Sequence, residues 1–107
     1  MIYKVIVQDS AAADARDYAI FLLEESKNQA IAARWLDELE TVIAGLSDMP
    51  KRYKLIDEQE GFVIELRQLL HYAHRVIYHV DETERLVHIV RIYHGAKQPL
   101  SLDDDPL

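Results

Sequence analysis

One stretch, residues 72–96, limits the possible folds of this chain more than any other part. It contains two runs rich in β-branched and aromatic residues, 72–80 and 86–94, separated by five polar residues. Such a pattern predicts a β-hairpin. The second run is apolar at Val87, Ile89 and Val90 without strict alternation, which is typical of a central strand covered on both faces.

The remaining segments predict an α+β fold. Helical spacing of apolar residues predicts two helices, from about residue 10 to 25 or 26 and from 29 to 46, and short strands are predicted at 2–7 and 62–66. Polar residues predict a loop over 51–61 and a turn over 68–71. The order β-α-α-β-β-β predicts a helical hairpin packed on one face of a small, mainly antiparallel sheet. We expect the opposite face to be partly bare, and hence a binding surface.

The sequence predicts one folded domain, residues 1–97, followed by a flexible acidic tail, residues 98–107. The tail contains two prolines and three consecutive aspartates, a composition typical of mobile segments. At 107 residues the chain is long enough for a core that needs no disulfide or metal. No signal peptide or membrane-spanning run is evident, which favours a cytoplasmic protein that does not interact with membranes.

The formal net charge is −7, and the chain has no cysteine. The charge disfavours direct nucleic-acid binding, because phosphate contacts dominate that affinity. The absence of cysteine excludes thiol catalysis and cysteine metal sites. Five histidines are present, but no carboxylate motif accompanies them, so we expect ordinary cross-strand histidines, with His79 facing His88, and neither a metal site nor a cofactor.

Basic residues near the strands and in the loop are the candidates for contact with a partner or target. For Arg67 and Arg75, pairing with Glu65 or with acids of the helices is as good an interpretation as contact with a partner. The candidates are Lys51, Arg52, Lys54, Arg67, Arg75, Arg91, His94 and Lys97.

The order of elements and several motifs resemble the RelE/ParE superfamily of bacterial toxins from type II toxin–antitoxin systems. The resemblance covers nearly the whole chain. It lies in YKVIV of the first strand, in Ala30, Trp35 and Leu39 of the second helix, and in Arg67. It is most specific in HRVIYHV and IVRIYHGA of the predicted hairpin.

This resemblance implies a cognate antitoxin as partner and one of two activities. RelE-type members are ribosome-dependent mRNA endonucleases, and Arg67, Arg75 and His94 match positions that such enzymes use. ParE-type members inhibit DNA gyrase and are not nucleases. In the matching RelE branch a catalytic tyrosine follows the histidine, whereas Gly95 follows His94 here. This departure and the negative charge favour a ParE-like, non-enzymatic inhibitor associated with plasmid stabilisation. A non-toxic relative that only binds an antitoxin is a third interpretation.

Overall fold

The computed structural model describes residues 2–95. Its sheet has the strand order β1-β4-β3-β2, with β1 parallel to β4 and the other pairs antiparallel. The predicted α+β fold and the central position of the last strand are therefore confirmed. The predicted tail, 98–107, lies outside the described residues. The elements are β1 (Lys4–Val7), α1 (Asp9–Ser26), α2 (Gln29–Ala44), β2 (Arg67–His71), β3 (His74–Asp81) and β4 (Leu86–His94).

The two helices are joined where the sequence predicted a break. Lys27 takes a left-handed conformation with φ of 56° and donates its backbone N–H to the carbonyl of Leu23, which ends α1. The side chain of Asn28 then accepts from the N–H of Ala30 and caps α2. α2 ends at Ala44, two residues earlier than predicted, because Gly45–Ser47 tightens into a 3₁₀ turn. None of the helices in residues 2–95 has both the length and the apolar character needed to cross a membrane.

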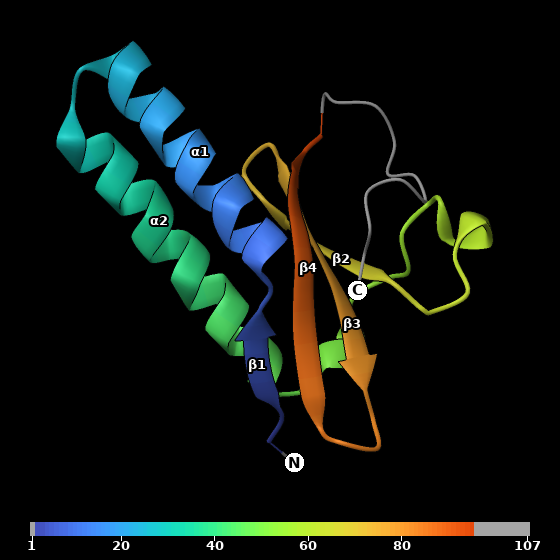
Figure 1. Ribbon diagram of the computed structural model, residues 1–107. Coiled ribbons are helices and arrows are strands. Elements are labelled where there is room, and N and C mark those ends of the chain that lie inside the picture. Colours follow the sequence, from blue (N-terminus) through green and yellow to red (C-terminus); the bar gives the residue numbers. More distant parts are fainter. Residues whose placement is uncertain (1, 96–107) are drawn as a thin grey trace.

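The main core lies between the helical hairpin and one face of the sheet. Trp35 and Leu39 of α2 pack there against Val76 and Tyr78 of β3 and Ile89 of β4, all buried. The hairpin covers this face as predicted, and Figure 1 shows both helices on one side of the strands. Burial of this apolar surface is the main force that holds the helices on the sheet.

The prediction of a strand at residues 62–66 is wrong. This segment is irregular. The strand β2 begins at Arg67 instead and includes residues 68–71, where the sequence predicts a turn. Phe62 and Leu66 are buried, but Val63 between them is fully exposed. The turn lies at residues 72–73, where Tyr72 has a φ of 53°. Apolar alternation at 62–66 therefore reflects side chains pointing onto the sheet from a covering loop.

The expectation of a bare second face is also wrong. The segment between α2 and β2 folds over that face, opposite the helices (Figure 1). It brings Ile56, Phe62 and Leu66 onto Ile77 and Val90, which are completely buried. The centre of the sheet is thus covered on both sides, giving three layers.

A β-bulge in β4 decides which side chains share a face. Tyr78 pairs with Ile89, whereas its neighbour Ile77 pairs with Arg91, so Val90 is an extra residue. Beyond the bulge, His74 lies opposite His94 and Arg75 opposite Tyr93. Because successive side chains of a strand point to opposite faces, the bulge places His94 on the helix side.

Candidate functional site

Arg75 is held against the covering loop by an acid. Its Nη1 and Nη2 donate to the two carboxylate oxygens of Glu58 at 3.0 and 2.7 Å, and Nη1 also donates to Gln68. The guanidinium lies 5.8 Å from the centre of the Tyr93 ring. Its hydrogen bond with Glu58 raises the pKa of Arg75 above the ordinary value. The positive charge of Arg75 is therefore balanced within the fold.

His94 lies on the opposite face of the sheet, under α1. Its ring centre is 4.8 Å from that of His74 and 6.1 Å from that of Tyr18. A cleft of about 470 Å³ opens here. It is lined by Asp14, Asp17, Tyr18, Phe21, His74, Ile92 and His94. The neighbours of His94 in this cleft are aromatic, apolar and acidic, with no arginine or lysine among the lining residues.

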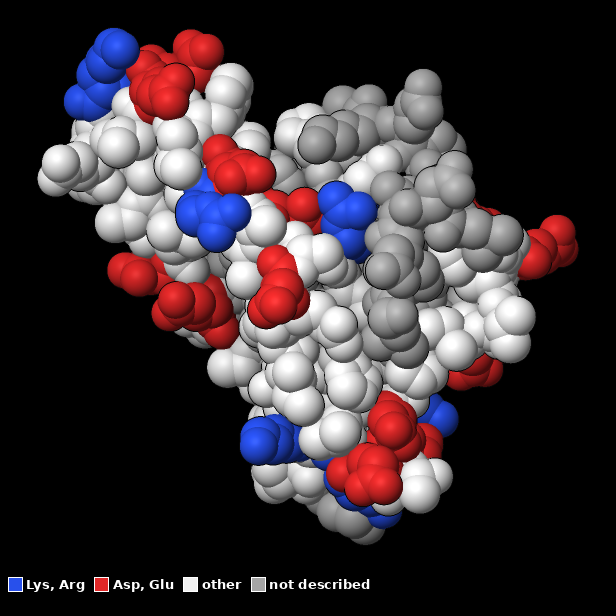
Figure 2. Space-filling view, viewed as in Figure 1, with Lys and Arg blue, Asp and Glu red and all other residues white. Residues whose placement is uncertain are grey.

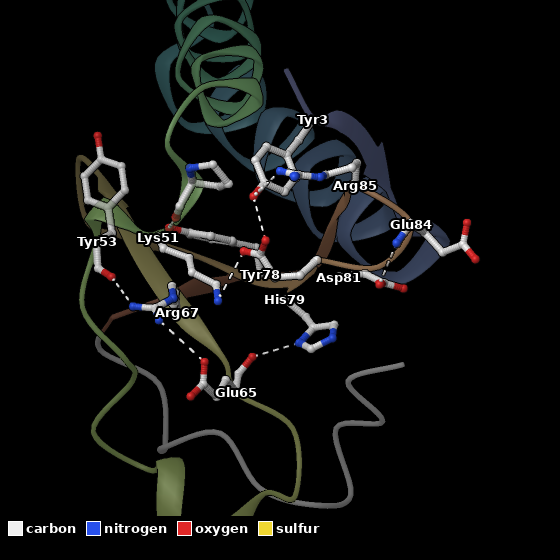
Figure 3. Close-up of polar contacts among 12 residues, drawn as sticks. Tyr3, Lys51, Tyr53, Glu65, Arg67, Tyr78, His79, Asp81, Glu84 and Arg85 are labelled. Atoms are coloured by element: carbon white, nitrogen blue, oxygen red, sulfur yellow. Dashed lines mark hydrogen bonds and ion pairs between the residues drawn. The ribbon is translucent and has the colours of Figure 1, made fainter. Parts of the chain in front are cut away.

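Arg67 occupies a third place, at the beginning of β2. Its Nη1 donates to the backbone carbonyl of Tyr53 at 2.8 Å, and its Nη2 lies 3.5 Å from Oε1 of Glu65 (Figure 3). The interpretation that pairs Arg67 with Glu65 is thus confirmed. For Arg75 the partner is Glu58 of the covering loop instead.

The three loop cations also have partners. Lys51 and Lys54 form ion pairs with Glu82 and Asp57 at 3.1 and 3.5 Å. The guanidinium of Arg52 donates to backbone carbonyls just after α2. These carbonyls belong to Gly45, Asp48 and Met49. Arg52 therefore ties its own loop to the helix end, where unpaired carbonyls accumulate.

Arg91 fastens α1 to β4. Its Nε and Nη2 donate to the two oxygens of Asp14 at 2.8 and 2.9 Å, and the backbone N–H of Ile92 donates to the same carboxylate. Ser10 of α1 donates to the carbonyl of Val90 nearby. Lys97, another predicted contact residue, lies outside the described residues.

Arg67, Arg75 and His94 are thus not brought together. Arg75 and His94 lie on opposite faces, and Arg67 pairs with Tyr78, nearer the other end of β3. RNA cleavage by attack of a 2′-hydroxyl requires an acid, a base and cations that converge on one phosphate. Among the described residues, Arg67, Arg75 and His94 lie at three separate places, so they do not converge on one phosphate.

The acids that pair with the candidate cations are the residues that sequence analysis missed. Asp14, Glu58 and Glu82 are 77, 17 and 31 positions away from their partners. Glu82 also accepts from the Tyr3 hydroxyl at 2.9 Å, and this bond, together with Lys51, lowers the pKa of Glu82 (Figure 3). No local spacing could have indicated these pairs.

The histidines lie in two places. His71, His74 and His94 lie near Trp35 or Tyr18 of the helices, and His79 and His88 lie on β3 and β4. His79 and His88 face one another as predicted, with ring centres 6.4 Å apart. Within residues 2–95 the structure has no group of three or more side chains that could hold a metal ion.

The protein should lose stability at high pH because the hydroxyl of Tyr78 is buried. Burial raises the pKa of Tyr78 from 10.0 to about 12, and its hydroxyl donates to the carbonyl of Pro50. The folded protein keeps this proton more tightly than the unfolded chain does, so stability is full below pH 10. About 2 to 3 kcal/mol should be lost between about pH 10 and 12.

Urea denaturation at several pH values measures this loss, with Tyr78→Phe as the control. The pKa of Tyr72 is also raised, mainly by its hydrogen bond to Glu38, but Tyr72 is common to both proteins. The difference between them therefore isolates Tyr78. Equal pH dependence of the two proteins would contradict the assignment.

An apolar groove lies between the two helices. It has a volume of about 610 Å³, and its lining is almost entirely apolar. Val7, Ile20 and Leu23 in its walls are between 38% and 48% exposed. The lining residues are Val7, Ala12, Ala15, Arg16, Ala19, Ile20, Leu23, Ala32, Ala33, Leu36, Leu39, Glu40, Ile43 and Ile92.

Comparison with known proteins finds a family and solved structures that are similar to this chain. Residues 5–99 match the family model described as the ParE toxin of the type II toxin–antitoxin system parDE. The fold is similar to a chain of the RelBE2 toxin–antitoxin complex from Mycobacterium tuberculosis, with a TM-score of 0.58, 20% identity, and coverage of 88% of this chain and 99% of that one.

A second similar structure is the archaeal RelE–RelB complex from Pyrococcus horikoshii. Its TM-score is 0.52, its identity 17%, and its coverage 92% of this chain and 100% of that one. The comparison with curated proteins finds no match. At these identities the two structural matches support the fold alone. The family match is a match of sequence, and it spans residues 5–99.

Proposed function

This chain belongs to the ParE toxin family of type II toxin–antitoxin systems, and we propose that it inhibits DNA gyrase by direct protein–protein contact until a cognate antitoxin neutralises it. The observation that supports contact over catalysis is the separation of Arg75 from His94 on opposite faces of the sheet. In addition, the described candidate cations have partners inside the fold, so they are not assembled into a phosphate site.

The antitoxin has a suitable place to bind in the groove between α1 and α2. Exposed Ile20 and Leu23 border a lining of small and apolar side chains. Such grooves bind one face of an amphipathic helix, whose apolar residues recur every three or four positions. The RelBE2 structure is a toxin–antitoxin complex, and the family model describes a toxin of a toxin–antitoxin system, which supports an antitoxin partner for this chain as well.

Purified protein added to gyrase and relaxed plasmid tests the proposed target. We expect supercoiling to stop and cleaved DNA to accumulate, while ribosome-bound mRNA incubated with the same protein stays intact. Adding the co-expressed antitoxin should restore supercoiling. Unchanged gyrase activity at concentrations that stop growth would reject gyrase as the target.

Two other outcomes correspond to the alternatives. Cleavage of ribosome-bound mRNA that disappears when Arg75→Ala and His94→Ala are combined would show a RelE-type endonuclease. Normal growth under strong induction would favour the third interpretation, a non-toxic relative that only binds an antitoxin.

A further inference from the structure

The charge around the groove between α1 and α2 is strongly unbalanced. Residues 9–44, which form the helical hairpin, contain eight acidic side chains and three basic ones. In Figure 2, acidic side chains predominate over the hairpin and border uncharged surface. The groove lining itself contains one base, Arg16 of α1, and one acid, Glu40 of α2. Negative charge therefore lies on the α2 side of the groove, which favours positive charge on that side of a partner.

Two acids mark the α2 edge of the groove. Ala33, Asp37 and Glu40 lie at spacings of four and three, so they share one stripe of the helix, and all three are exposed. Ala33 and Glu40 belong to the groove lining. Within residues 2–95 neither Asp37 nor Glu40 forms an ion pair. Their charges are therefore available to a partner.

The groove also limits the length of its occupant. Along α1 its lining runs from Ala12 to Leu23, which corresponds to about 16 Å, or three helical turns, at the usual rise per residue. Five alanines in the lining leave room for large side chains from the partner. A helix of about three turns therefore fits both the length and the depth.

We propose that the antitoxin segment that fills this groove is an amphipathic helix of about three turns whose apolar face is flanked by lysine or arginine on the side of α2. The apolar face packs on the alanines, Leu36 and Leu39, and the basic side chains pair with Asp37 and Glu40. This inference rests on the proposed function, since it specifies the chemistry of the antitoxin in the same groove.

Three synthetic helical peptides of about 14 residues test the charge preference. They share one apolar stripe and carry lysine, glutamine or glutamate at the flanking positions. Fluorescence polarisation with the purified protein should show the lysine peptide binding about tenfold more tightly than the glutamate peptide at low salt. The difference should shrink to about twofold at high salt, because exposed charges are screened.

Matched variants locate the effect. Asp37→Lys combined with Glu40→Lys should reverse the preference between the lysine and glutamate peptides. Ala33→Trp fills the groove from an exposed position and should weaken all three peptides by about tenfold or more. Ala30→Trp, also exposed on α2 but outside the lining, should change little.

Three results would overturn the inference: equal or tighter binding of the glutamate peptide, a preference that survives the double charge reversal, or no binding by any peptide. These measurements use only the purified protein and do not depend on gyrase. A clear lysine preference without gyrase inhibition would reject the proposed target alone. Gyrase inhibition without a charge preference would reject this inference alone.

Discussion

Replacing Leu66 with alanine should lower the free energy of unfolding by about 2–5 kcal/mol. Leu66 is completely buried and lies with Phe62 against Ile77 and Val90 on the second face of the sheet. Truncation removes apolar contacts and leaves a cavity that the surrounding irregular segment fills only in part. Urea denaturation followed by circular dichroism measures the loss.

Val63→Ala is the matched control, since Val63 is in the same segment and is fully exposed. We expect its effect to stay within about 0.5 kcal/mol. If Leu66→Ala changed stability as little as Val63→Ala does, the covering segment would not be packed on the sheet. The face opposite the helices would then be open to a partner after all.

Replacing Asp14 with alanine should cost about 3 kcal/mol of stability. The Asp14 and Arg91 side chains are only 19% and 18% exposed, and the Asp14 carboxylate also accepts from the backbone N–H of Ile92. Its removal leaves a mostly buried guanidinium and one backbone donor without this acceptor. Thermal and urea denaturation both report the change.

Asp17→Ala provides the comparison for Asp14→Ala. Asp17 lies one turn along the same helix, but its side chain is 74% exposed and its nearest contact with Arg16 is 3.7 Å long. Exposed pairs of this kind contribute little, so we expect a loss below about 0.5 kcal/mol. Similar losses for the two aspartates would show that Asp14 does not fasten α1 to β4.

Most of the fold follows from local sequence patterns. The helices and the hairpin have apolar spacing that recurs over many residues, and the Lys27–Asn28 boundary has its own capping chemistry. The segment 62–66 was mistaken for a strand because Phe62, Ile64 and Leu66 alternate with polar or exposed residues whether they belong to a strand or to a loop lying on a sheet. Alternation reports burial on one side and does not report which backbone pairs.

The candidate site was harder to predict for a different reason. The sequence identifies Arg75 and Arg91 as cations, but their acidic partners come from distant segments that only the folded chain brings near. The bulge at Val90 adds a second difficulty, because one extra residue in β4 decides whether His94 or Tyr93 faces His74. Strand register beyond such a bulge cannot be read from alternation alone.

The parallel pairing of β1 with β4 has a consequence for biosynthesis. Lys4 pairs with Leu86 and Val7 with Ile89. During synthesis β1 therefore cannot join the sheet until β4 has been made. Closing so long a loop is entropically costly and slow. A nascent chain interrupted before residue 86 has neither the central strand nor a place for its amino-terminal strand. The sheet can therefore be completed only after the residues of β4 that pair with β1, Leu86 to Ile89, have been synthesised.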